Sequence, residues 1–346
     1  MLPSQVKMGT PQNNMETALF LDAASRGAAY LSLIRARSVA PAAEDVARLQ
    51  QLGGPLPQHG TDPSDVLRLL DDVGSPATIA NSGARYFGFV IGGAFPVTRA
   101  ANVLAAAWDQ NASLHIMSPT AAALEEIALE WLLDLLNLPR TSGGAFVTGA
   151  TMANLCGLAA ARHALLERAG WDVEAQGLFG APPLTVVVGE ETHVSVQKAL
   201  GLLGLGRNRV VTVETDSQGR MRVDRLPPLN ALSIVCAQAG NVNTGSFDPF
   251  AGLCDAANEA GAWVHVDGAF GLWAAASEAH AGFVRGMSEA HSWATDAHKW
   301  LNVPYDCGLA FVRDADALRL SMAMQAAYLA SDAGRDPMSQ VTVRRD

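Results

Sequence analysis

Seven short apolar runs, separated by stretches with helical spacing, restrict most strongly how this chain can fold. Between residues 144 and 313 they read GAFVTG, LTVVVG, RVVTVE, LSIVCAQ, AWVHVD, SWATDA and GLAFVR. Runs of this length without polar alternation predict strands that are buried on both faces, and the helical stretches between them predict crossover connections. We therefore expect an α/β fold, with a mainly parallel sheet sandwiched by helices.

The first part of the chain has a different pattern, without strand signals. Residues 16–73 carry apolar residues at helical spacing, and the stretch DPSDVLRLLDDV begins with the aspartate and proline typical of a helix start. We expect an N-terminal helical segment over residues 1–80, a large α/β domain over 81–325, and the start of a mobile loop and a C-terminal region over 326–346.

Composition narrows the class of function. The 346 residues are 49% hydrophobic and carry a formal net charge of −10, so a basic face for nucleic acid or an anionic membrane is not expected. No apolar run reaches the roughly 18 residues of a membrane span. The four cysteines form no C-x-x-C pair, so we expect free thiols and no metal site. These features predict a cytoplasmic protein that acts on a small molecule.

Ligands of parallel sheets bind outside the carboxyl ends of the strands, so the residues after each run are candidates for a site. After the first run, the backbone N–H groups of Gly149, Ala150 and Thr151 begin a long predicted helix and could bind a phosphate. The same stretch is equally compatible with a plain helix start capped by Thr151.

Three further run ends carry a polar side chain with two interpretations each. His193 is a cap or core group, or a ring that contacts a ligand. Asp267 forms a structural ion pair, or it holds a protonated ring nitrogen. Lys299, in SWATDAHKW, is a partly buried surface side chain or an amine that forms a Schiff base.

A pyridoxal phosphate enzyme requires a phosphate site, a histidine, a carboxylate and a lysine, and this chain has candidates for all four in this order. The chain resembles the group II pyridoxal-dependent amino-acid decarboxylases of fold type I, the aspartate aminotransferase superfamily. The resemblance covers roughly residues 60–330 and is carried by HVDGAFG, DAHKW, THVSVQKA and TGATMANLCGLAAAR. Relative to that family, the chain is expected to lack the C-terminal lobe.

The resemblance assigns a role to each candidate residue. It implies that Lys299 forms an aldimine with pyridoxal 5'-phosphate, that Asp267 pairs with the pyridine nitrogen, and that His193 stacks on the ring. The remaining implied contacts are Gly149, Ala150 and Thr151 at the phosphate with His298 beside it, Ala269 under the ring, Asn241 in place of a hydroxyl contact, and Tyr328 near the substrate α-carbon.

The implied reaction is decarboxylation of an L-amino acid to the amine and carbon dioxide through a quinonoid. His193 and Tyr328 favour it over transamination, because aminotransferases of this fold usually stack an aromatic ring on the cofactor. An aminotransferase, a carbon–carbon lyase or a truncated noncatalytic remnant are the alternatives. The resemblance also implies a homodimer, and the sequence does not identify the amino acid.

Besides Asn241 and the expected lack of the C-terminal lobe, one further position departs from the family pattern. The usual asparagine three residues before the lysine is Asp296. A carboxylate here would repel the phosphate unless its side chain is turned away from the phosphate site.

Overall fold

The computed structural model describes residues 11–112 and 114–323. The chain divides into two compact units, Met1–Gly93 and Ala94–Asp346, which are described separately. The sequence-based limits at residues 80 and 325 remain a prediction. No helix in the described ranges is long and apolar enough to cross a membrane.

The first unit consists of helical segments, as the sequence indicates. They are α1 (Pro11–Leu33), α2 (Ala43–Arg48), η1 (Leu49–Leu52), α3 (Pro63–Leu69), η2 (Leu70–Gly74) and α4 (Ser75–Ala77). Helix α3 begins where the sequence predicts, because the Asp62 carboxylate accepts a hydrogen bond from the Ser64 N–H at 2.8 Å, with Pro63 at the first helical position. Among the described residues of this unit, only Val73 and Ala80 are buried.

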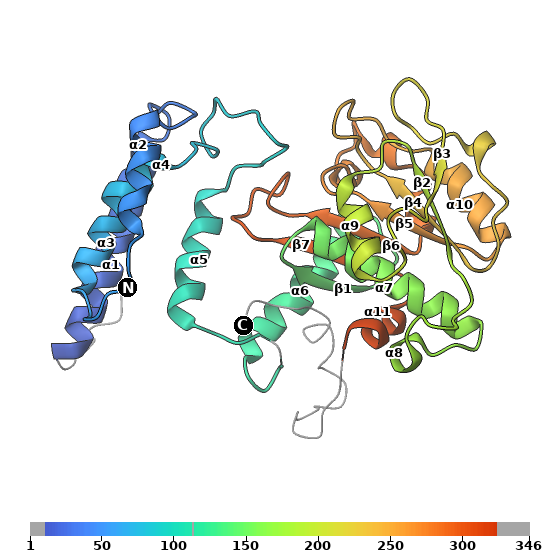
Figure 1. Ribbon diagram of the computed structural model, residues 1–346, viewed down its shortest axis with the longest axis horizontal. Helices are drawn as coiled ribbons and strands as arrows, with labels where there is room; N and C mark the ends of the chain where they lie inside the picture. Colours follow the sequence, from blue (N-terminus) through green and yellow to red (C-terminus); the bar gives the residue numbers. More distant parts are fainter. Residues whose placement is uncertain (1–10, 113, 324–346) are drawn as a thin grey trace. The chain divides into compact units, whose positions relative to one another are not determined.

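The second unit contains a seven-stranded sheet, and all seven predicted runs form its strands (Figure 1). They are β1 (Gly143–Val147), β2 (Thr185–Gly189), β3 (Val211–Val213), β4 (Ser233–Gln238), β5 (Trp263–Asp267), β6 (Ser292–Asp296) and β7 (Gly308–Val312). The order is β1-β7-β6-β5-β4-β2-β3, and only β7 is antiparallel to its neighbours. The expected mainly parallel α/β fold is therefore confirmed, and six strands end at the same edge.

Helices cover both faces of the sheet. On one face α7 (Ala150–Arg168), α9 (Val194–Leu202) and α11 (Ala315–Met322) share a hydrophobic cluster with the sheet, and on the other α6 (Pro119–Leu135) and α10 (Phe250–Glu259) do so. Adjacent strand residues point to opposite faces, so Val187 belongs to one cluster while Val186 and Val188 belong to the other. The other elements are α5 (Pro96–Trp108), α8 (Val173–Gln176), η3 (Val223–Arg225), η4 (Gly271–Ala276), η5 (Ala281–Val284) and η6 (Met287–Glu289).

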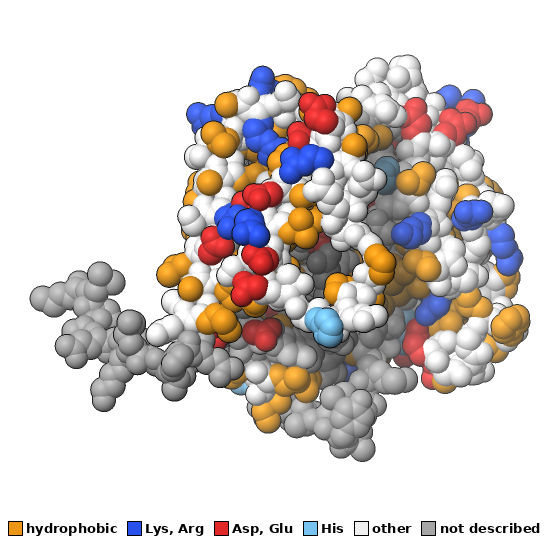
Figure 2. Space-filling model, turned by 60° about the vertical axis from the view of Figure 1, so that its left-hand side comes forward, with side chains coloured by type: hydrophobic (Ala, Val, Ile, Leu, Met, Phe, Trp, Pro, Cys, Tyr) orange, Lys and Arg blue, Asp and Glu red, His pale blue; other side chains and the backbone are white. Residues whose placement is uncertain are grey.

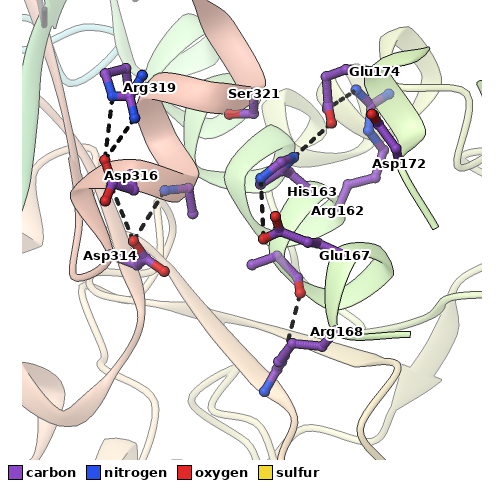
Figure 3. Close-up of polar contacts among 12 residues, drawn as sticks. Arg162, His163, Glu167, Arg168, Asp172, Glu174, Asp314, Asp316, Arg319 and Ser321 are labelled. Carbon is purple, nitrogen blue, oxygen red and sulfur yellow. Dashed lines mark hydrogen bonds and ion pairs between the residues drawn. The ribbon is translucent and has the colours of Figure 1, made fainter. Parts of the chain in front are cut away.

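Polar contacts hold the C-terminal half of α7. His163 Nδ1 lies 2.6 Å from the carboxylate of Glu174, which also lies 3.4 Å from Arg162 (Figure 3). Glu174 belongs to α8, whose first turn is capped by Asp172. Because α7 is fixed at this end and packs on the central strands, its N-terminus has a defined place at the carboxyl edge of the sheet.

Candidate active site

The carboxyl edge of the sheet brings the predicted residues together from separate parts of the sequence. Strands β1, β2, β4, β5 and β6 end on this edge, since β1 runs in the same direction as β6 through the intervening antiparallel β7. The candidates that follow or end these strands are Gly149, Ala150 and Thr151 after β1, His193 after β2, Asn241 after β4, Asp267 and Ala269 at β5, and His298 and Lys299 after β6.

Lys299 is held by an ion pair with Asp296. Its amino nitrogen lies 2.9 Å from Asp296 Oδ2, and the two side chains are only 18% and 5% exposed. The pairing places the amine beside the end of β6, mostly withdrawn from solvent. His298, the next residue back, also approaches this carboxylate, with Nε2 at 3.7 Å from Oδ2.

Asp296 also contacts the start of α7. Its Oδ1 accepts a hydrogen bond from the backbone N–H of Ala150 at 2.6 Å. Gly149 precedes this amide, and Gly308 packs so closely on it that a Cβ at Gly308 would lie 2.4 Å from the Gly149 carbonyl carbon. The carboxylate of Asp296 therefore faces the predicted phosphate site and is not turned away from it.

Asp267 ends β5 in a buried position, 4% exposed. Its Oδ2 accepts hydrogen bonds from Asn154 Nδ2 at 3.0 Å and Ser195 Oγ at 3.3 Å, and its Oδ1 accepts the Ala269 N–H at 3.2 Å. Burial raises the pKa of this carboxyl group, while the Asn154 hydrogen bond and the electrostatic effects of His193 and Lys299 lower it. The side chains of His193 and Lys299 are therefore close enough to Asp267 to act on its charge.

His193 is the N-cap of α9. Its Nδ1 lies 2.8 Å from Ser195 Oγ and accepts the Ser195 backbone N–H at 3.3 Å. The ring is otherwise exposed, on the edge where β2 ends. The capping interpretation is thus correct for Nδ1, and it leaves Nε2 and the ring face open to a ligand.

The remaining candidates differ in their surroundings. The Nδ1–H of His298 donates to the Cys307 carbonyl at 3.2 Å, and its ring lies 4.2 Å from that of Tyr305. The side chain of Thr151 is exposed.

Asn241 is buried, donates to Glu191 at 2.7 Å, and accepts two backbone N–H groups of its own turn. Tyr328 lies outside the described residues, and all of these roles in cofactor binding stay predictions.

Sequence reasoning missed four polar residues of this region: Asn154, Ser195, His265 and Ser292. All four are buried, and they lie between the sheet and α7 or α9. A sequence signal for His265 was present in WVHVD. Its tryptophan, histidine and aspartate can all form hydrogen bonds, and they occupy alternate positions of a buried strand, so they share one face.

A mainly parallel sheet with a lysine, a carboxylate, a histidine and a helix start along one edge is the arrangement of fold type I pyridoxal phosphate enzymes. The pyridoxal-dependent decarboxylase conserved domain matches residues 88–343. The chain belongs to this family of pyridoxal-dependent decarboxylases. The cofactor of the family is pyridoxal 5'-phosphate.

Among curated relatives, the chain is 28% identical over 310 residues to an aromatic-L-amino-acid decarboxylase of Bacillus atrophaeus, covering 87% of this chain and 62% of that protein. It is 31% identical over 269 residues to tryptophan decarboxylase 1 of Oryza sativa subsp. japonica, covering 69% and 52% respectively. An acidic amino acid decarboxylase of Mus musculus is 28% identical over 283 residues, covering 78% and 50%. The chain thus spans between 50% and 62% of the length of these relatives.

Two solved structures have the same fold. Mouse CSAD in its apo form superposes with a TM-score of 0.82 at 23% identity, covering 94% of this chain and 72% of that chain. Oryza sativa TDC with PLP and tryptamine superposes with a TM-score of 0.81 at 25% identity, covering 94% and 69%.

Proposed function

We propose that this chain binds pyridoxal 5'-phosphate and decarboxylates an L-amino acid to the corresponding amine and carbon dioxide. The observation that carries the proposal is the placement of the Lys299 amine and the buried Asp267 carboxylate on one sheet edge, beside the start of α7. An amine suits the aldehyde of this cofactor, and a buried carboxylate suits a protonated ring nitrogen. When bound, the cofactor supplies an electron sink that accepts the electrons of the α-carbon to carboxylate bond.

The residues of the chain would bind and orient the reactants. Lys299 would hold the aldehyde carbon, and Asp267 would keep a proton on the ring nitrogen. His193, whose Nδ1 is held by Ser195, has its other nitrogen available to move a proton to the α-carbon. The amides at the start of α7 would meet the phosphate if Asp296 releases the Ala150 N–H.

Cofactor capture is tested by mixing the protein with pyridoxal 5'-phosphate, reducing with borohydride and mapping the modified peptide. The chain has three lysines, of which Lys198 and Lys299 are described, so the map is easy to interpret. We expect the adduct on Lys299, lost in Lys299→Ala and retained in the matched control Lys198→Ala. An adduct that survives in Lys299→Ala would reject the assignment.

The reaction type is tested by its products. Amine and carbon dioxide in equal amounts support decarboxylation, whereas a keto acid as the main product would reject it in favour of transamination. An aldehyde released with the rest of the substrate would indicate a carbon–carbon lyase. A trapped Lys299 adduct without any turnover of L-amino acids would identify a noncatalytic binding protein.

A homodimer is proposed because the first unit buries so little of its own apolar surface. Its helices leave Met15, Leu21 and Leu33 55%, 62% and 59% exposed, and Phe87 and Phe89 about 90% exposed. Figure 2 shows hydrophobic side chains distributed among the charged ones on this face. A second copy would remove such a surface from water.

Light scattering at micromolar protein should then give twice the chain mass of 36.3 kDa, and Leu21→Glu should reduce it toward a single chain. A monomer for the unsubstituted protein would contradict the dimer. We also propose a cytoplasmic location, supported by the four cysteines, all of which are free thiols.

A further inference from the structure

A line of buried polar side chains connects the interior of the sheet with Asp267. Trp263, His265 and Asp267 alternate along β5 and therefore face the same helix, α7. Ser292 of β6 and Asn154 of α7 lie between them. His265, Ser292 and Asn154 are 0% exposed, and the two ends of the line are 3% and 4% exposed.

Each member of this line is hydrogen-bonded to the next. Trp263 Nε1 lies 2.9 Å from Ser292 Oγ, which lies 2.8 Å from His265 Nδ1. His265 Nε2 lies 2.9 Å from Asn154 Oδ1, and Asn154 Nδ2 lies 3.0 Å from Asp267 Oδ2. We call these five residues the donor chain.

The hydrogen-bond directions in the donor chain follow from the Asp267 end. Asn154 Nδ2 donates to the Asp267 carboxylate, so Asn154 Oδ1 faces His265 and accepts the hydrogen of its Nε2. Burial lowers the pKa of His265 to about 3, so the ring is neutral and its Nδ1 accepts the hydrogen of Ser292 Oγ. Ser292 Oγ in turn accepts the indole N–H of Trp263, which can only donate.

All four bonds therefore donate toward the carboxylate. We propose that the donor chain keeps Asp267 ionised, so that it holds the cofactor's ring nitrogen protonated, and that Asn154 and His265 are positioning residues for it. The proposal rests on the proposed function. Hydrogen bonds to the charged form of a buried acid favour that form, and aligned hydrogen bonds strengthen one another.

Helix α7 has a glycine, Gly157, where it covers the His265 ring of the donor chain. A Cβ at this position would lie 2.7 Å from Cε1 and 2.8 Å from Nδ1 of His265. A glycine in the middle of a helix makes the helix less stable than an alanine would, and here it makes room for the imidazole. The spacing of Asn154 and Gly157, three residues apart, places both on the helix face that covers His265.

Ser195 is a weaker alternative donor to Asp267. Its Oγ lies 3.3 Å from Oδ2 of the carboxylate but only 2.8 Å from His193 Nδ1, and it has a single hydrogen for the two. Asn154 is closer and can donate to both Asp267 and Ser195, at 3.0 and 3.1 Å. The last step of the donor chain therefore depends on Asn154.

The charged and titratable groups around Asp267 come from each neighbouring element. His193 and Lys299 act on its charge from the start of α9 and the end of β6. On β4, burial and then the charge of Asp267 raise the pKa of the Cys236 thiol to about 12. Ser292 makes no hydrogen bond to these groups, whereas Asn154 also donates to Ser195, which contacts His193. A change shared by the Asn154 and Ser292 variants can therefore be attributed to the donor chain.

The test is the protonation of the cofactor ring, measured by NMR on protein loaded with pyridoxal phosphate that carries ¹⁵N in the ring. The unsubstituted protein should keep the ring nitrogen protonated between about pH 6 and 9. Asn154→Ala should lower the pKa of the ring nitrogen by about one unit or more, a tenfold change in the protonation equilibrium. Ser292→Ala, two bonds further away, should lower it less.

Ser233→Ala is the matched control, since it removes an equally buried hydroxyl from β4, outside the donor chain. It should titrate like the unsubstituted protein. Normal ring titration in both Asn154→Ala and Ser292→Ala, with an adduct at Lys299, would overturn the donor chain and leave the proposed function intact. Absence of any Lys299 adduct in the unsubstituted protein would instead reject the proposed function and this inference with it.

A second measurement tests the donor chain without any substitution, so it still applies if the variants fail to fold. In the unsubstituted, cofactor-free protein, NMR of the imidazole nitrogens should show His265 neutral with its hydrogen on Nε2 at neutral pH. A hydrogen on Nδ1, or an imidazolium, would reverse or break the chain of donors and reject the proposal.

Discussion

The amino group of Lys299 lies 2.9 Å from one oxygen of Asp296, and the other oxygen accepts the backbone N–H of Ala150 at 2.6 Å. A single carboxylate thus connects the amine predicted to bind the cofactor with the amide predicted to bind its phosphate. The Asp296 carboxylate thus brings a negative charge to both the Lys299 amine and the Ala150 amide. A phosphorylated ligand has to displace or tolerate this anion, because like charges in a buried site repel each other.

Replacement of Asp296 by asparagine should therefore accelerate cofactor capture. The amide side chain of Asp296→Asn would keep an oxygen for the Ala150 N–H, while the negative charge beside Lys299 and the phosphate is removed. We expect about a tenfold faster rate of adduct formation at Lys299, equivalent to ~1.4 kcal/mol. The rate is measured by stopped-flow absorbance after mixing with pyridoxal phosphate.

Asp134→Asn is the control for net charge, because Asp134 is a half-exposed acid paired with Arg140 at 2.8 Å. It should leave the rate unchanged. A slower rate for Asp296→Asn would show instead that the carboxylate helps to orient Lys299 for attack on the aldehyde.

Two glycine substitutions in helices should have opposite effects on stability. Gly157→Ala would place a Cβ 2.7 Å from the His265 ring and should lower the free energy of unfolding by about 1–3 kcal/mol. Gly201, in α9, has no atom within 4 Å of an added Cβ, so Gly201→Ala should raise it by about 0.5–1 kcal/mol. Urea unfolding of both variants measures these changes, and a neutral Gly157→Ala would mean that the imidazole can move aside.

The strands could be predicted from sequence because each is a continuous apolar run, and the site region followed from them. Parallel strands end at the same edge, so polar residues such as Asp267 and Lys299 after two different runs had to lie near each other. The local sequence pattern was sufficient, because neither the strands nor their shared edge requires knowledge of the strand order in the sheet.

The contacts of the site were not predictable in the same way. The bond between Asp296 and Ala150 joins residues 146 positions apart, and it exists only because β1 and β6 flank β7. His265 reads as one more residue of a buried strand until its register next to Ser292 is known. Pairings of this kind depend on strand order, which the sequence alone left open.

Neutral His265 should make the protein less stable in acid. Its folded-state pKa is about 3, below the ordinary value of 6.5, so between these values the unfolded chain binds one more proton than the folded protein. Stability should therefore fall by about 1.4 kcal/mol for each pH unit below 6.5 from this residue alone. His265→Gln should remove that part of the slope in urea unfolding between about pH 6 and 4.

The comparison between variant and unsubstituted protein is essential, because Asp248 acts with the opposite sign. Burial raises its pKa from 3.8 to about 6, so its contribution to stability falls as pH rises through that range. This contribution is the same in both proteins and cancels in the difference. His280→Gln, at an exposed histidine, should keep the slope of the unsubstituted protein, and an unchanged slope in His265→Gln would contradict a neutral imidazole.

Asp267→Ala should separate the rate of the reaction from cofactor binding. Without this carboxylate nothing at the end of β5 holds a proton on the ring nitrogen, so turnover should fall by several powers of ten, each worth about 1.4 kcal/mol of transition-state stabilisation. Cofactor affinity should fall less, because Lys299 and the start of α7 are still present. Carbon dioxide release divided by the amount of borohydride-trapped Lys299 adduct gives turnover per loaded site. A near-normal value for Asp267→Ala would assign the stabilisation of the ring proton to another group, and a loss of adduct equal to the loss of turnover would make Asp267 a binding residue only.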